Sequence, residues 1–301
     1  MNTRPMWIMA LLTAVALTGC GKATNPVASS PDNGGGTVGS DQAQVSAVLQ
    51  NNPEYVDDDV WANDQTQSLD AANGYAAISP LRWRRVITHV DRNVSTEFGV
   101  PDSAGHPTMA FVTVTKHITG KLNIMAASGD PVDTALVQKP IDDQSTRKLV
   151  LKRVAMSDSI RWRLVGTSGV EVHTNGGSTH IASLRIQSAG IDTTITDPLE
   201  LHRLRRIMIF QPGAPVTLTA TTGRNDDVVL FYGHDMRRRF ANNGDGSYTF
   251  QFPSGRFPGL RHLGVDALSN GTLFDDAAAY DSNAWLLAFA VDAALGPIER
   301  R

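Results

Sequence analysis

Residues 109–125, MAFVTVTKHITGKLNIM, alternate apolar and polar side chains over most of their length. A period of two is typical of a β-strand that buries one face. Residues 80–98, which begin PLRWRRVITHV, show the same period. The segment between them, GVPDSAGHP at residues 99–107, is rich in turn-forming residues. The sequence therefore predicts a long antiparallel hairpin, and with it a mainly β fold.

Further alternating segments follow on both sides of Pro212, after a loop that we expect at residues 128–143. Turn signals separate the later segments about every ten residues, which is typical of an antiparallel sandwich. Residues 199–210, LELHRLRRIMIF, suit a helix or a strand, and we expect a strand only at their C-terminal end. The other expected strands are residues 148–154, 160–165, 170–173, 180–187, 191–196, 216–220, 228–232, 236–240, 248–252, 260–268 and 285–291.

The expected fold class is therefore mainly β, with two antiparallel sandwich-like domains at residues 80–211 and 212–297. Residues 243–249, NGDGSYT, followed by GLRHLGVDALSNG at 259–271, resemble a hairpin and final strand of bacterial immunoglobulin-like or fibronectin-like modules. The resemblance covers the last third of the chain. It implies an immunoglobulin-like sandwich there and no particular activity, and a further strand after residue 282 departs from its simplest form. For residues 80–211 we expect a second sandwich or a partly open barrel.

The N-terminus carries a positive residue, Arg4, and then an apolar run, MWIMALLTAVAL, that is too short to span a bilayer. The run ends in Leu17-Thr18-Gly19-Cys20, which resembles the lipobox of bacterial lipoproteins. The resemblance implies that residues 1–19 are a signal peptide and that Cys20 carries lipid such as palmitate. Gly21, in place of an Asp, favours the outer membrane within that resemblance.

Two short segments follow the expected anchor. Residues 20–44 are rich in Gly, Ser, Asn and Pro, so we expect a flexible tether. Residues 45–79 form an acidic segment in which Val45, Val48 and Leu49 share a helical spacing, so we expect one or two short helices.

The composition limits the classes of function. The formal net charge is −3, which is too balanced to favour nucleic acid as a partner. Cys20 is the only cysteine, so no disulfide can form within the chain. After the signal segment, no apolar run is long enough for a transmembrane helix.

Two groups of acids are candidates for a Ca²⁺ site, because oxygen ligands suit that ion. They are Asp57, Asp58 and Asp59 in the acidic segment, and Asp275, Asp276 and Asp281 in a later loop. Three consecutive acids point in different directions on a helix, so we interpret the first group as a solvated acidic face. We therefore expect no bound metal and no cofactor. The tight turn at 242–246 lacks the acids of an EF-hand, and we expect Asp245 to bond local backbone amides.

No catalytic set emerges from the sequence. The eight histidines show no metal-ligand spacing, although His89 and His117 lie on the paired strands and could face each other. Gly166-Thr167-Ser168-Gly169 falls one position short of a nucleophile elbow. The repeated Arg-Trp-Arg at residues 82–84 and 161–163 predicts an inward Trp flanked by outward Arg, which protect a strand edge or pair with an anion.

We therefore expect a lipid-anchored cell-envelope protein with a non-enzymatic binding, adhesive or structural role. Its expected partners are the membrane, through the anchor, and a protein or glycan that the sequence does not identify. The alternative is an envelope hydrolase with a site in residues 80–211 or at the domain interface.

Overall fold

The computed structural model describes residues 38–56, 67–68, 77–128, 133–156, 159–233 and 236–292. These residues belong to one compact unit, Thr37–Arg301. The fold is mainly β, with a large curled sheet, a second sheet and a short helix before them, as the alternating patterns predict. Within the described ranges, no helix has both the length and the apolar character needed to cross a bilayer.

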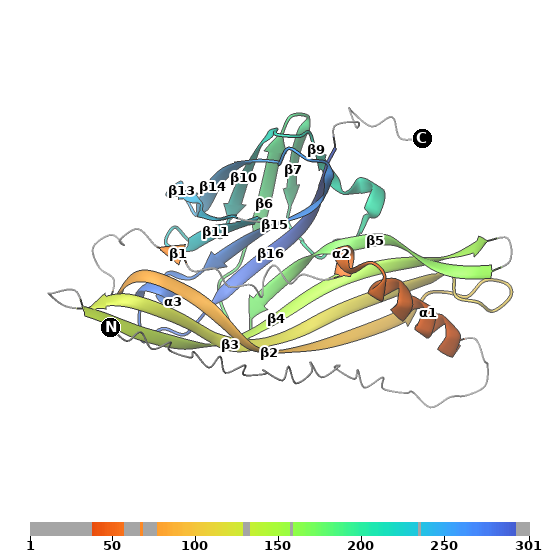
Figure 1. Cartoon of the computed structure of the whole chain (residues 1–301), viewed down its shortest axis with the longest axis horizontal. Coiled ribbons are helices and arrows are strands. Elements are labelled where there is room, and N and C mark those ends of the chain that lie inside the picture. The colour runs from red at the N-terminus through yellow and green to blue at the C-terminus, as the bar shows by residue number, and fades with distance from the viewer. Residues whose placement is uncertain are drawn as a thin grey trace, which may run out of the picture. The chain divides into compact units, whose positions relative to one another are not determined.

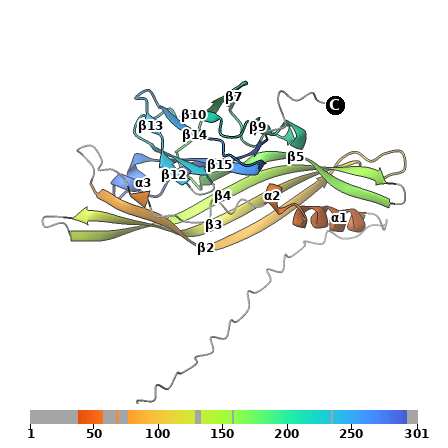
Figure 2. The same cartoon turned by 45° about the horizontal axis from the view of Figure 1, so that its top comes forward.

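The larger sheet has the strand order β1-β2-β3-β4-β5-β16-β15-β11-β12, with β8 attached to β5 and β9 attached to β16 (Figure 1). Its neighbours pair antiparallel except β9 and β16, which are parallel. Figure 2 shows β2 to β5 side by side as one curved layer. The bounds are β1 Gln67–Ser68, β2 Ser79–Phe98, β3 Met109–Ser128, β4 Asp133–Met156, β5 Ser159–Thr174, β8 His202–Arg203, β9 Met208–Phe210, β11 Val228–Gly233, β12 Met236–Arg239, β15 Gly259–Leu268 and β16 Ser282–Val291.

The smaller sheet has the order β13-β14-β10-β6-β7 and packs against β11, β15 and β16 through a shared sandwich core. In β10 the buried Val216, Leu218 and Ala220 alternate with less buried threonines, as the sequence predicts. The bounds are β6 Ser183–Ser188, β7 Ile191–Ile195, β10 Pro215–Thr221, β13 Ala241–Asn242 and β14 Ser247–Pro253.

The strands do not separate into two sets at residue 211. Strand β5 pairs with β16 in the larger sheet and β6 pairs with β10 in the smaller one, so each sheet takes strands from both expected domains. Leu184 and Ile186 of β6 are buried in the same core as Val216 and Leu218 of β10. Residues before and after 211 therefore bury their apolar side chains in one shared core. The turn signals from which we placed a boundary at residue 211 do not reveal this sharing.

The expected loop at residues 128–143 is also wrong for most of its length. Residues 133–147 are the first part of β4, which pairs with β3 from Asp133 to Lys152. Four of the side chains on its buried face are polar, namely Lys139, Asp143, Ser145 and Arg147. Because the buried positions are polar, a hydrophobicity pattern does not mark this strand.

Helix α1, Val38–Gln50, starts inside the segment that we expected to be a tether. Asp41 is buried and accepts a hydrogen bond from Nε1 of Trp162 at 2.9 Å. Val45 and Leu49, one and two turns later, pack against apolar side chains of β3, β4 and β5. A buried acid fixes the start of the helix, so composition alone is misleading there. The expected short helices are confirmed as α1 and α2, Pro53–Val56.

A second core lies where the curled sheet meets the short helix α3, Asn270–Phe274. It encloses a polar network in which Arg85 of β2 bonds Asp266 of β15 and the hydroxyl groups of Tyr232 and Tyr280. Arg85 and Asp266 are fully buried. These hydrogen bonds connect β2 with β11 and β15, which are distant along the order of the larger sheet.

Candidate functional site

The candidate site is built around residues 202–206, which begin as a short strand beside β5. His202 and Arg203 form β8 and pair with Thr167 and Gly166 of β5. Leu204–Arg206 then form the 3₁₀ turn η1, and β9 follows. The expected strand at the C-terminal end of residues 199–210 is thus confirmed, and one 3₁₀ turn stands where a helix was the alternative.

Glycines in β5 let this segment approach closely. A Cβ atom at Gly166 would lie 3.0 Å from the carbonyl oxygen of His202. A Cβ atom at Gly169 would lie 2.8 Å from the carbonyl oxygen of Leu286. The two glycines of Gly166-Thr167-Ser168-Gly169 therefore let the backbones of β8 and β16 come close to β5, which is one of the ordinary roles of glycine in a strand.

Residues 203–205 and the neighbouring parts of β3, β4 and β5 line a groove of about 610 Å³. Leu204 of η1 packs against the core under α1, while Arg203 and Arg205 on either side of it are exposed. The groove is lined by Lys152, Arg163, Arg203, Arg205, Met109, Val154, Leu164, Val165 and Leu204. We call it the cationic groove, since four of its lining residues carry a positive charge and none is an acid.

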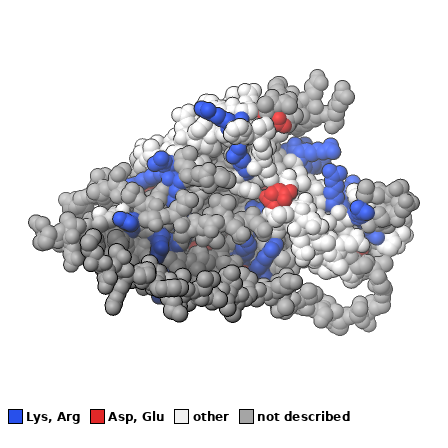
Figure 3. Space-filling view, viewed as in Figure 1, with Lys and Arg blue, Asp and Glu red and all other residues white. Residues whose placement is uncertain are grey.

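Two of these cations are held directly opposite each other. Lys152 of β4 and Arg163 of β5 are register partners in neighbouring antiparallel strands, and both are exposed. Like charges at such positions destabilise a sheet. Figure 3 shows Lys and Arg side chains gathered in several patches toward the right of the face seen in Figure 1. Within the described part of the chain, no ion pair joins these four cations to an acid.

A second pocket, of about 440 Å³, is lined in part by His202 and Arg206 at the two ends of residues 202–206. Ser168, Asp197, His202 and Arg206 are among its lining residues. The Ser168 hydroxyl accepts a hydrogen bond from the Lys148 amide at 2.8 Å and donates one to the Gly169 carbonyl at 2.6 Å. Its proton is therefore directed at the backbone, and the geometry does not present it as a nucleophile to His202.

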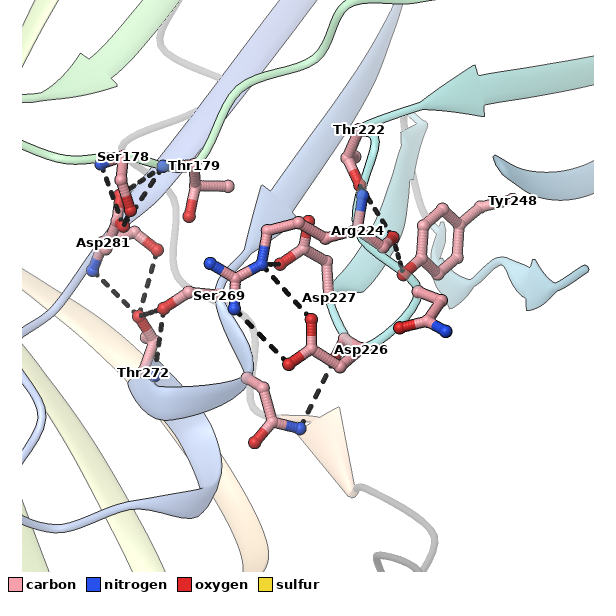
Figure 4. Close-up of polar contacts among 12 residues, drawn as sticks. Ser178, Thr179, Thr222, Arg224, Asp226, Asp227, Tyr248, Ser269, Thr272 and Asp281 are labelled. Atoms are coloured by element: carbon pink, nitrogen blue, oxygen red, sulfur yellow. Dashed lines mark hydrogen bonds and ion pairs between the residues drawn. The ribbon is translucent and has the colours of Figure 1, made fainter. Parts of the chain in front are cut away.

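The candidate acids of the later loop are occupied by local contacts. Asp281 accepts hydrogen bonds from the amide and hydroxyl of Ser178 and from the amide of Thr179 (Figure 4). Asp275 accepts one from the Ala277 amide, and Asp276 is exposed. Among the described residues, no group of three or more His, Cys, Asp or Glu side chains could hold a metal ion.

Figure 4 also shows an ion-pair cluster of Arg224, Asp226 and Asp227. Nε of Arg224 lies 3.2 Å from Asp226 and 3.5 Å from Asp227. Burial raises the pKa of the Asp227 carboxyl, and Arg224 opposes that rise. The arginine therefore balances this acidic pair.

Other sequence predictions fall as follows. Cys20, Asp57, Asp58 and Asp59 lie outside the described residues. Asp245 accepts a hydrogen bond from the Ser247 amide, as expected. His89 and His117 do not face each other, because their register partners are Thr119 and Asp91.

The two Arg-Trp-Arg sequences behave as predicted. Trp83 and Trp162 are buried, and the arginines on either side of each are exposed. Arg163 is thereby presented to the cationic groove.

Our sequence reasoning missed Lys152, Arg203 and Arg205 as a group. A usable signal was present, since residues 203–206 contain three arginines around one leucine. Their convergence on Lys152 and Arg163 depends on the pairing of β8 with β5, which no local pattern shows.

Comparisons with known protein families, with curated proteins and with solved structures found no match to this chain.

Proposed function

We propose that this chain is an exported lipoprotein of the bacterial cell envelope, attached through lipid on Cys20, that binds an anionic ligand without catalysing a reaction. The observation that carries the binding role is the direct opposition of Lys152 and Arg163, with Arg203 and Arg205 beside them. Locally unfavourable arrangements of this kind are typical of functional sites. An anion in the groove would relieve the repulsion.

The proposed attachment rests on the lipobox-like Leu17–Cys20 and the apolar run before it. Gly21 supports the outer membrane as the destination. The test is a Cys20→Ser chain, which we expect to incorporate no palmitate and to leave the membrane fraction. Continued palmitate labelling of that variant would rule the attachment out.

The binding role is tested with dextran sulfate, a polyanion with no specific structure to recognise. We expect the full chain to bind it and the affinity to fall as salt is added, because salt screens exposed charges. Arg163→Gln with Arg205→Gln should weaken binding at least ten-fold. The matched control is Arg238→Gln with Arg239→Gln, which removes two exposed arginines of β12 that do not line the groove.

Equal affinity in the double variant and the control would refute the groove as the binding site. The rival proposal, an envelope hydrolase, would use the pocket that contains Ser168 and His202. Turnover of an ester substrate that Ser168→Ala abolishes would favour that rival.

A further inference from the structure

The lining of the cationic groove falls into two chemical classes. Lys152, Arg163, Arg203 and Arg205 supply positive charge, whereas the other five lining residues, Met109, Val154, Leu164, Val165 and Leu204, are apolar. A purely ionic ligand would leave the part-exposed Met109, Val154, Val165 and Leu204 in contact with water. A ligand with an anionic group beside an apolar body would cover both classes, and burial of apolar surface adds to binding.

The cations also specify the kind of anion. Side chains that are direct register partners lie about 5 Å apart at Cβ, so Lys152 and Arg163 can reach one anionic group together. Arginine forks bind phosphate through two parallel hydrogen bonds. A phosphate monoester carries up to two negative charges near neutral pH, whereas a diester carries one. Four converging cations therefore match a monoester better than a diester.

We propose that the cationic groove binds the phosphate monoester headgroup of an anionic membrane lipid, with the start of the acyl chains against the apolar lining. This inference rests on the proposed function, because the lipid on Cys20 keeps the groove within reach of a bilayer. Lys152, Arg163, Arg203 and Arg205 hold the phosphate, and Leu204 and Val165 contact the apolar part.

The test uses the full lipidated chain in nanodiscs of phosphatidylcholine. Phosphatidic acid, a monoester, or phosphatidylglycerol, a diester, is added at increasing mole fraction. Amide hydrogen exchange of residues 202–206 reports occupancy of the groove. We expect half-maximal protection at about a ten-fold lower mole fraction of phosphatidic acid, which corresponds to about 1.4 kcal/mol. Arg163→Gln with Arg205→Gln should remove the protection, and Arg238→Gln with Arg239→Gln should retain it.

Three outcomes would overturn the inference. Equal protection by both lipids refutes the monoester. Equal protection by soluble glycerol 3-phosphate refutes the membrane lipid as the source. Protection that survives in the variant with Arg163→Gln and Arg205→Gln refutes the groove. In each case dextran sulfate binding is measured separately, so the lipid inference can fail while the anion-binding function stands.

Discussion

Arg85 and Asp266 form a two-pronged ion pair in the interior of the curled sheet. Nη1 of Arg85 lies 2.9 Å from Oδ2 of Asp266, and Nη2 lies 3.2 Å from Oδ1. Both side chains are fully buried, and the Tyr232 hydroxyl donates a further hydrogen bond to Asp266 at 2.8 Å. The pair joins β2 to β15, so it fixes how the two ends of the larger sheet meet.

Breaking this pair should be costly. Arg85→Met leaves the Asp266 carboxylate buried without its cation, and such a change typically costs about 3–5 kcal/mol. We expect chemical denaturation to show that loss. The neighbouring Arg84 is exposed, so Arg84→Met is the matched control and should stay within about 0.5 kcal/mol of the parent. Similar values for the two variants would show that the buried pair does not stabilise the fold.

Asp143 should make stability depend on pH. Burial raises the pKa of its carboxyl to about 6, and Arg85 and the hydroxyls of Thr174 and Tyr280 only partly oppose that rise. The folded state therefore binds the proton more tightly than the unfolded state, so stability falls as pH rises from about 4 to about 6 and then levels off.

Asp143→Asn removes this titration. Between pH 5 and pH 7 the unfolding free energy of the parent should fall by roughly 1 kcal/mol relative to the variant. Denaturation curves at the two pH values measure the difference. Parallel behaviour of the two proteins would place the Asp143 pKa below this window.

A side chain at Gly120 should lower the stability of the fold. It lies at the β2–β3 bulge, where a Cβ atom would clash with the carbonyl oxygen of Val86 and the Cα of Ile87. Gly120→Ala should therefore cost about 1–3 kcal/mol. The same substitution at Gly39 of α1, which has open space around it, should stabilise by up to about 1 kcal/mol through helix propensity. Thermal unfolding should show a lower midpoint for Gly120→Ala and a higher one for Gly39→Ala. An unchanged midpoint for Gly120→Ala would contradict the bulge geometry.

Trp162 should hold helix α1 on the sheet. Trp162→Phe keeps a smaller aromatic ring and removes the donor to the buried Asp41, and the loss of that hydrogen bond should cost about 1–3 kcal/mol. Amides of residues 41–50 should exchange faster in the variant, while those of β15 change less. Unchanged exchange in α1 would mean that the apolar contacts of Val45 and Leu49 suffice to dock it.

The fold was predictable where buried positions are apolar. The alternation of β3 and the threonine–apolar pattern of β10 indicated strands correctly. It was not predictable where polar side chains are buried. Lys139 and Asp143 hid the first part of β4, and Asp41 hid the start of α1, because their hydrogen bonds replace the apolar signal.

The candidate site was only partly predictable. The Arg-Trp-Arg pattern placed Arg163 on the surface and raised the pairing of its arginines with an anion. That Lys152 lies opposite it depends on the β4–β5 register, which includes bulges. That Arg203 and Arg205 join them depends on a pairing across 37 residues between Gly166 and Arg203. Such long-range pairing leaves no local trace in the sequence.

The central claim is that Lys152 and Arg163 lie opposite each other in order to bind an anion, although their repulsion lowers the stability of the sheet. Lys152→Thr tests it most directly, with thermal unfolding and dextran sulfate affinity measured on the same sample. We predict that stability rises by up to about 1 kcal/mol, because a like-charge pair is removed, and that affinity falls several-fold. Unchanged affinity together with unchanged or lower stability would contradict the account.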